Sequence, residues 1–265
     1  MNRFLKIMIV TRLAVAGLSV CVRAAMRIAD RTGVFALRMA EFAGSVKSSG
    51  KIVTHNIGEL HFRGIEAATA AKVKVRSADD PGRDVILRVN EDMAELVELK
   101  VRKGILKISL KSNTYSFKKL NSMTFEVSVP HCDELSSLEA VAGAEIDVSS
   151  PLTAGKVSIE AVGASKIEVP LDCAECESEA TGASKIRLKG RCEKLSAEAV
   201  GASKIDASEC ESLTCDTEAV GASSIKVWCT EQLTVEAVGA SKVAYRGNCE
   251  ISASTTGASR ITKIE

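Results

Sequence analysis

One octapeptide recurs through the second half of the chain and restricts what the chain can fold into. It reads EAVGASKI at residues 160–167 and again at 198–205. Close copies stand at residues 179–186, 218–225, 236–243 and 254–261, and a looser one at 139–146. The central glycines of the six close copies are 18 to 20 residues apart. A fixed period of about 20 residues is typical of a solenoid built from stacked coils.

The residues within one repeat alternate as in a β-strand. Around Gly201, every second residue from Leu195 to Ala207 is small or apolar, and the residues between them carry all the charges. Such alternation indicates one buried and one exposed face. Helical repeats need about 33 residues or more. We therefore predict an all-β fold, a single-stranded parallel β-helix (β-solenoid) with coils about 4.8 Å apart and a bend at each glycine.

The composition fits a narrow, layered core. Hydrophobic residues make up 46% of the 265 residues but aromatic residues only 3%, so the apolar side chains are mostly small or branched. The net charge is +1. Because no strong field attracts nucleic acid, we expect no nucleic-acid partner.

The first 45 residues differ from the rest. They contain seven basic residues against two acidic ones, and residues 13–22 form a short apolar run followed by Arg-Ala-Ala. This pattern indicates a signal-like leader and predicts export to the cell envelope, the surface or the medium. A short N-terminal helix and a misassigned start are the alternatives. The run is too short for a confident membrane span, so membrane association is expected only through this segment.

Cysteines recur with the same period, at positions 173, 192, 210, 229 and 249. We expect an inward-facing column of free thiols that behave as small apolar groups. In this alignment Cys176 takes the place of Leu195 and Cys215 that of Ala197. The Cys173–Cys176 spacing is then no metal or redox site, and no metal or cofactor is expected.

The register predicts two rows of charge on the outer surface, on either side of the bend. The glutamate row comprises Glu139, Glu160, Glu179, Glu198, Glu218 and Glu236. The cationic row comprises Lys166, Lys185, Lys204, Lys242 and Arg260, with Glu145 and Ser224 as interruptions. Like charges at one strand spacing repel, and pairing between the two rows could offset this. Either row could bind a repetitive polymer, or both could be solvated surfaces.

The first half of the chain is also rich in predicted strands, at residues 73–77, 84–89, 105–110 and 123–129. Residues 91–99 fit a helical turn or a broken strand. Residues 65–75 align without a gap with residues 159–169. We therefore predict a leader over residues 1–45 and one β-helix domain over 46–265. Degenerate head coils would span 46–131, and regular repeats 132–265.

Several segments resemble the head GIN domain family of autotransporter adhesins. They are IVTHNI at residues 52–57, FRGIE at 62–66, GILKI at 104–108, VSVP at 127–130 and the GASKI copies. The resemblance covers about residues 50 to 265 and implies a right-handed parallel β-helix behind a signal peptide or lipoprotein signal. The family's adhesin label rests on its fold. The family has no known catalytic residues, so the resemblance implies none in this sequence.

Three functions fit these patterns. The first is a non-enzymatic surface or secreted protein that binds a glycan or protein in an adhesin-like manner. The second is a polysaccharide lyase or hydrolase, although coils of 18 to 20 residues leave little room for a catalytic cleft and the histidines, at positions 55, 61 and 131, lie outside the regular repeats. The third is a structural or assembly element of the cell envelope. Trp228 and Tyr245 are the only late aromatic residues, and packing fits them better than sugar binding.

Overall fold

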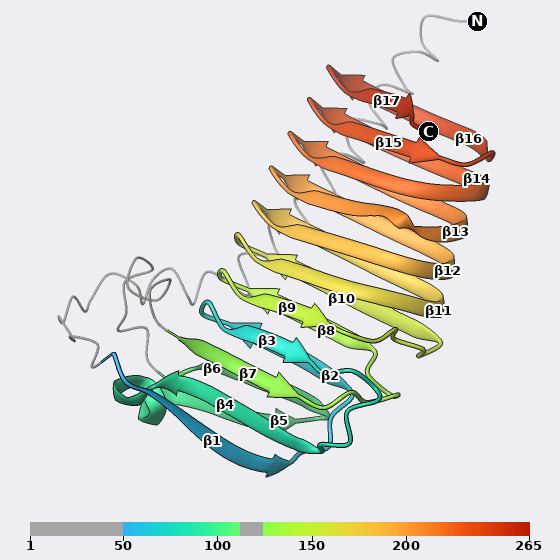
Figure 1. The fold of residues 1–265 in the computed structure, drawn as a ribbon. Coiled ribbons are helices and arrows are strands. Elements are labelled where there is room, and N and C mark those ends of the chain that lie inside the picture. The colour runs from blue at the N-terminus through green and yellow to red at the C-terminus, as the bar shows by residue number, and fades with distance from the viewer. Residues whose placement is uncertain (1–49, 112–123) are drawn as a thin grey trace, which may run out of the picture.

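The computed structural model describes residues 50–111 and 124–265, and almost all ordered elements in these ranges are strands. The strands form one continuous sheet that winds into a rod of stacked coils (Figure 1). The predicted parallel β-solenoid is therefore confirmed. The predicted leader lies outside the described residues. None of the helices in the described part of the chain is long and apolar enough to span a membrane.

The regular coils occupy the C-terminal part of the rod, from yellow-green to red in Figure 1. Their strands are β8 (Ser137–Val141), β9 (Glu145–Val148), β10 (Lys156–Val162), β11 (Lys166–Gly182), β12 (Lys185–Gly201), β13 (Lys204–Gly221), β14 (Ser224–Gly239), β15 (Lys242–Arg246), β16 (Glu250–Gly257) and β17 (Arg260–Lys263). Each repeat pairs in parallel with the next, Gly182 opposite Gly201 and Gly201 opposite Gly221. One coil cannot enclose its own inner face, so the stack supplies the core.

The octapeptide is explained by the bend it forms. Gly201 adopts φ +87°, a left-handed conformation that favours glycine, and the other repeat glycines do likewise. Ser203 then turns inward, and its hydroxyl donates hydrogen bonds to the carbonyl oxygens of Val200 (3.1 Å) and Ala180 (2.8 Å). The alanine before the bend is fully buried in every copy from Ala161 to Ala237. In each repeat the glycine thus turns the chain and the alanine fills the narrow end of the core. The serine hydroxyl donates hydrogen bonds to carbonyl groups there.

The cysteines depart in part from the predicted column. Cys176 lies opposite Leu195, as predicted, but Cys215 also lies opposite Leu195 and not in the Ala197 position. The reason is a bulge after Asp206, whose carboxylate accepts hydrogen bonds from the Ser208 amide and hydroxyl. The extra residue shifts the following segment by one.

The bulge also changes the thiol neighbours. Cys192 lies opposite Cys173 on one side and Ser212 on the other, and Cys210 lies opposite Gly190. The Cys192 and Cys210 sulfurs remain 4.0 Å apart. The cysteines of the described ranges are all free thiols, and most of them are buried. The column is therefore interrupted by serine, although its members still pack in the core.

The head strands are β1 (Ile52–Glu59), β2 (Gly64–Ala68), β3 (Lys72–Val75), β4 (Asp84–Asn90), β5 (Val97–Arg102), β6 (Ile105–Leu110) and β7 (Phe125–Val129), with a 3-10 helix η1 (Glu91–Leu96) before β5. The predicted alignment of the first coil is confirmed, because Ile65 lies opposite Leu138 and Leu138 opposite Ile159. Residues 91–99 combine both predicted alternatives, a short helix followed by a strand.

The head coils do not stack in chain order. Strands β2 and β3 lie between β6 and β7 on one side and β8 and β9 on the other, as Figure 1 shows. The chain thus leaves the first coil, builds the end of the rod and returns to the far side of that coil. Strands β2–β3 and β6–β7 stack in parallel like coils, whereas β1, β4 and β5 pair antiparallel. This antiparallel layer closes one end of the core over Met93 and Val85, which are fully buried.

At Gly190 the backbones of two neighbouring coils lie close together. It adopts φ +95°, and a Cβ at this position would overlap the carbonyl oxygen of Leu171 in the adjacent coil. We expect Gly190→Ala to lower the free energy of unfolding by about 2 to 4 kcal/mol, because it adds backbone strain to a backbone clash. Chemical denaturation would measure the change.

Gly155→Ala is the matched control, since a Cβ there would meet no atom within 4 Å. Its unfolding free energy should change by less than about 0.5 kcal/mol. Equal effects of the two substitutions would contradict the proposed contact.

Candidate binding faces

The glutamate row lies on the sheet formed by the strands that precede each bend. Glu139, Glu160, Glu179, Glu198, Glu218 and Glu236 are in register on successive strands, as the sequence predicts. The structure adds Glu66 on β2, which lies opposite Glu139. Glu66 also forms an ion pair with Lys107 on β6, the next strand. All seven side chains are half-buried.

Burial and like charge act together at Glu218. Burial raises the pKa of this carboxyl from 4.5 to about 7, and the charges of Glu198 and Glu236 above and below it add to the effect. Desolvation and neighbouring negative charge both disfavour the ionised form. The row therefore carries less negative charge near neutral pH than its seven carboxyl groups would carry in water.

The cationic row lies on the sheet that follows each bend. Lys166, Lys185, Lys204, Lys242 and Arg260 are in register, with Glu145 and Ser224 as the predicted interruptions. The structure adds Lys72 on β3, opposite Glu145. The alignment of residues 65–75 with 159–169 contained this information, since it places Lys72 with Lys166.

Ion pairs of the cationic row run along the strands rather than across the bend. Lys166 lies 2.9 Å from Glu168, and Lys204 lies 3.7 Å from Asp206. The hydrogen bond between Lys166 and Glu168 raises the pKa of the lysine and lowers that of the glutamate. Pairing between the two rows was one way in which the repulsion could be offset. In an alternating strand, however, residues i and i+2 share a face, so a partner on the same strand is nearer.

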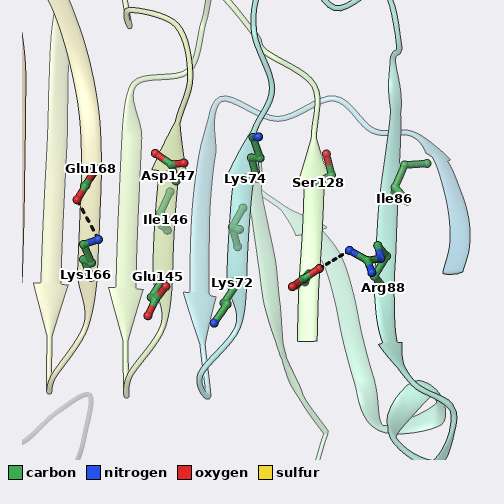
Figure 2. A pocket seen from close by; sticks show the side chains of 12 residues that line it. Lys72, Lys74, Ile86, Arg88, Ser128, Glu145, Ile146, Asp147, Lys166 and Glu168 are labelled. Atoms are coloured by element: carbon green, nitrogen blue, oxygen red, sulfur yellow. Dashed lines mark hydrogen bonds and ion pairs between the residues drawn. The ribbon is translucent and has the colours of Figure 1, made fainter. Parts of the chain in front are cut away.

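A hollow of about 460 Å³ lies at the base of the cationic row (Figure 2). Five strands line it, namely β4, β7, β3, β9 and β11. One row of its lining alternates in charge: Arg88, Glu126, Lys72, Glu145 and Lys166. The parallel row is more varied and consists of Ile86, Ser128, Lys74, Asp147 and Glu168. The hollow thus lies where the parallel coils meet the antiparallel end layer.

Two basic groups of the hollow, Lys72 and Lys74 on β3, lie opposite the carboxylates of Glu145 and Asp147 in the register. Arg88 is paired with Glu126 at 2.8 Å, and Lys166 with Glu168. Within the described chain, the exposed ammonium groups of Lys72 and Lys74 have no ion pair or hydrogen bond. Ser128, the short side chain next to Lys74, leaves space between longer neighbours. The hollow can therefore accept an anionic group at β3, with hydroxyl and carboxylate acceptors beside it.

A second hollow, of about 510 Å³, lies beside Cys173 and Cys192. Arg191 bridges its surface to Asp172 with two hydrogen bonds, of 2.7 and 3.1 Å. Burial raises the pKa of the Cys173 thiol to about 12. A thiol in this state is a poor nucleophile, because the thiolate is the reactive form. Arg191, the one basic residue that lines this hollow, is therefore already paired.

One face of the Trp228 ring is already covered by another side chain. The Arg246 guanidinium carbon lies 3.8 Å from the centroid of the ring. This arrangement is a cation–π contact between neighbouring coils, since Trp228 and Arg246 are opposite one another in the register. In the ranges that the structure describes, no group of three or more histidine, cysteine or acidic side chains is arranged to hold a metal ion.

Comparison with known proteins identifies the family. A family model described as "Putative auto-transporter adhesin, head GIN domain" matches residues 61–249. The chain belongs to this family. No curated protein sequence matches the chain.

Solved structures of other proteins show the same fold. One from Bacteroides fragilis, called a putative adhesin, has a TM-score of 0.71 at 20% identity, covering 83% of this chain and 100% of that chain. One from Parabacteroides merdae, also called a putative adhesin, has a TM-score of 0.63 at 18% identity, with coverage of 83% and 99%. A Parabacteroides distasonis protein called a putative lipid binding protein has a TM-score of 0.62 at 18% identity, again with coverage of 83% and 99%. At these identities the likeness shows the fold alone.

Glu218 predicts an unusual dependence of stability on pH. Its folded-state pKa of about 7 lies above the ordinary value of 4.5, so the folded chain holds this proton more tightly than the unfolded chain. The free energy of unfolding therefore falls as the pH rises from 4.5 to 7. We expect Glu218→Gln to stabilise the protein at pH 8 by about 1 kcal/mol, allowing for partial solvent exposure, and to leave it unchanged at pH 4.

Thermal unfolding at the two pH values measures this difference. A gain of about 1 kcal/mol corresponds to a rise of about 2 to 4 °C in Tm for a chain of this size. If Glu218→Gln changed Tm equally at pH 4 and pH 8, ionisation of the Glu218 carboxyl would not destabilise the folded protein.

Proposed function

We propose that the protein is a non-enzymatic, adhesin-like binding protein of the cell envelope that holds an acidic glycan on its cationic face. Membership of the head GIN family supports an exported, adhesin-like role. The ligand class is inferred from the hollow, where the ammonium groups of Lys72 and Lys74 have no partner among the described residues. Its volume of about 460 Å³ falls within the range of small-ligand sites.

The lining suits one acidic sugar unit. A carboxylate or sulfate would lie between Lys72 and Lys74, where charge-assisted hydrogen bonds are strongest. The Ser128 hydroxyl would donate or accept hydrogen bonds, and the Asp147 carboxylate would accept them from sugar hydroxyls. Ile86 supplies an apolar contact at the edge of the hollow.

The cationic row extends the same site along the rod. Lys166 and Lys185 continue from the hollow on successive strands, and strands are spaced at about 4.8 Å. Lys185 has no ion pair within the described chain. A linear polymer with repeated anionic groups could therefore run from the hollow along this face. Charge would provide most of the recognition, because Trp228 is already stacked by Arg246.

The charged lining favours a polar ligand over a lipid chain. One structural neighbour is called a putative lipid binding protein, but an acyl chain needs a mostly apolar pocket. In this hollow Ile86 is the one apolar side chain of the two outward-facing rows described above.

The double variant Lys72→Ala/Lys74→Ala tests the proposal. We expect its affinity for immobilised polygalacturonate, hyaluronan or chondroitin sulfate to fall at least tenfold, which corresponds to about 1.4 kcal/mol. Biosensor binding at two salt concentrations measures the loss, and salt should weaken binding of the unmodified protein. Neutral dextran should not bind. Size-exclusion chromatography of the polymer after incubation should show no shortening.

The matched control is Lys189→Ala/Lys194→Ala, which removes two exposed lysines outside the hollow. It should keep the affinity within about threefold. No binding to any acidic polymer, or an equal loss in both double variants, would refute the proposed site. Shortened polymer would instead support a lyase or hydrolase.

A further inference from the structure

The thiols of Cys192 and Cys210 lie beside one another in neighbouring coils. Their sulfur atoms are 4.0 Å apart, and the Ser212 hydroxyl oxygen is 3.4 Å from the Cys192 sulfur. Cys210 lies opposite Gly190, which precedes Cys192 by two residues on β12. Since Gly190 has no side chain, the Cys210 thiol can lean toward Cys192. The two cysteines therefore form a close diagonal pair across the coils.

This diagonal arrangement does not favour a disulfide bond. With coils about 4.8 Å apart and a rise of about 3.3 Å per residue, positions offset by two residues have Cα atoms about 8 Å apart. A disulfide needs Cα atoms closer than about 7 Å and a sulfur–sulfur bond of about 2 Å. A bond between Cys192 and Cys210 would therefore require the two backbones to move.

The same separation of the sulfurs fits one metal ion shared between them. A zinc–sulfur bond is about 2.3 Å long, so an ion bonded to two sulfurs holds them about 4 to 4.6 Å apart at angles of about 120° to 180°. Zinc needs four ligands, and the described ranges contain no group of three or more histidine, cysteine or acidic side chains arranged to hold a metal. Cu(I) forms bonds of similar length, binds with two sulfur ligands and prefers soft thiolates. The thiol pair therefore fits Cu(I) better than zinc.

The second hollow gives an ion access to this pair. Cys192 lines the hollow of about 510 Å³, whereas Cys210 is fully buried. Three carboxylates and one guanidinium line the same hollow, namely Asp172, Glu193, Glu211 and Arg191. The excess of negative charge attracts a cation. Cys192 is then the thiol that an entering ion meets first, and the buried thiol of Cys210 is the second ligand.

We propose that Cys192 and Cys210 bind one Cu(I) ion between neighbouring coils, and that the ion enters through the second hollow. Each thiol loses its proton on binding, and the copper remains monovalent. The bound ion links β12 to β13 without a bond between the two sulfurs. The site shares no residue with the hollow at Lys72 and Lys74, so the inference does not depend on glycan binding.

Anaerobic titration of the reduced full chain with Cu(I), in competition with a coloured Cu(I) chelator, tests the site. We expect Cys192→Ala/Cys210→Ala to weaken the tightest binding by at least about 100-fold, because it removes both ligands. The matched control Cys215→Ala/Cys229→Ala removes two buried thiols from β13 and β14. It should keep the affinity within about threefold, since both proposed ligands remain. Thermal unfolding without copper checks that both variants are folded.

X-ray absorption spectroscopy of the unmodified protein with one equivalent of Cu(I) needs no variant. Two sulfur neighbours are expected, whereas three or more sulfur neighbours, or nitrogen ligands, would contradict the pair. Should Cys192→Ala/Cys210→Ala fail to fold, the single variant Cys192→Ala, at the wall of the hollow, replaces it. Equal loss of affinity in the alanine variant and the control, or no loss in either, would overturn the proposal. Acidic-glycan binding is measured with separate variants, so either proposal can fail alone.

Discussion

Hydrogen bonding between in-register parallel coils is the constraint on which the rest of the structure depends. Gly182, Gly201, Gly221 and Gly239 lie opposite one another because every coil repeats the path of the one before. A side chain in one coil therefore has its equivalents directly above and below it. Inward positions become columns of one residue type, and outward positions become rows of one charge. The core gains dense packing from this rule, whereas the outer rows are left with repulsion between like charges.

The two outer rows handle this repulsion differently. The cationic row is interrupted by Glu145 and Ser224, and acidic residues two positions along the strand neutralise Lys166 and Lys204. The glutamate row has no interruption from Glu66 to Glu236. The cost is visible at Glu218, whose pKa is raised by burial and by its two neighbours. The parallel register thus concentrates like charge on one face of the rod at strand spacing.

The sequence was sufficient to predict the features that repeat in every coil. It was insufficient where one coil differs from the next. The period and the alternation give the parallel coils, the bend at Gly201 and the register of both rows. Cys215 was misplaced because one extra residue after Asp206 forms a bulge, and a repeat count does not show where in a longer coil the extra residue lies. The path of the head was also beyond the sequence. Strands β2 and β3 pair with β6 and β7 on one side and with β8 and β9 on the other, and all four of these strands come later in the chain. The period of the repeat does not predict such a non-local order.

The same failure of repetition creates the hollow. In the regular coils a given row mostly carries side chains of similar length, with Ser224 as the exception in the cationic row. At the head, β7 places Ser128 next to Lys74, and β4 runs antiparallel with Ile86 and Arg88 at the rim. The hollow combines the gap at Ser128 with two adjacent lysines that have no ion pair within the described chain. The antiparallel layer thus closes the core and, at its junction with the first coil, forms a local hollow. A ligand held there would be fixed in position along the rod, and the cationic row could then contact the rest of a polymer without having to select where it begins.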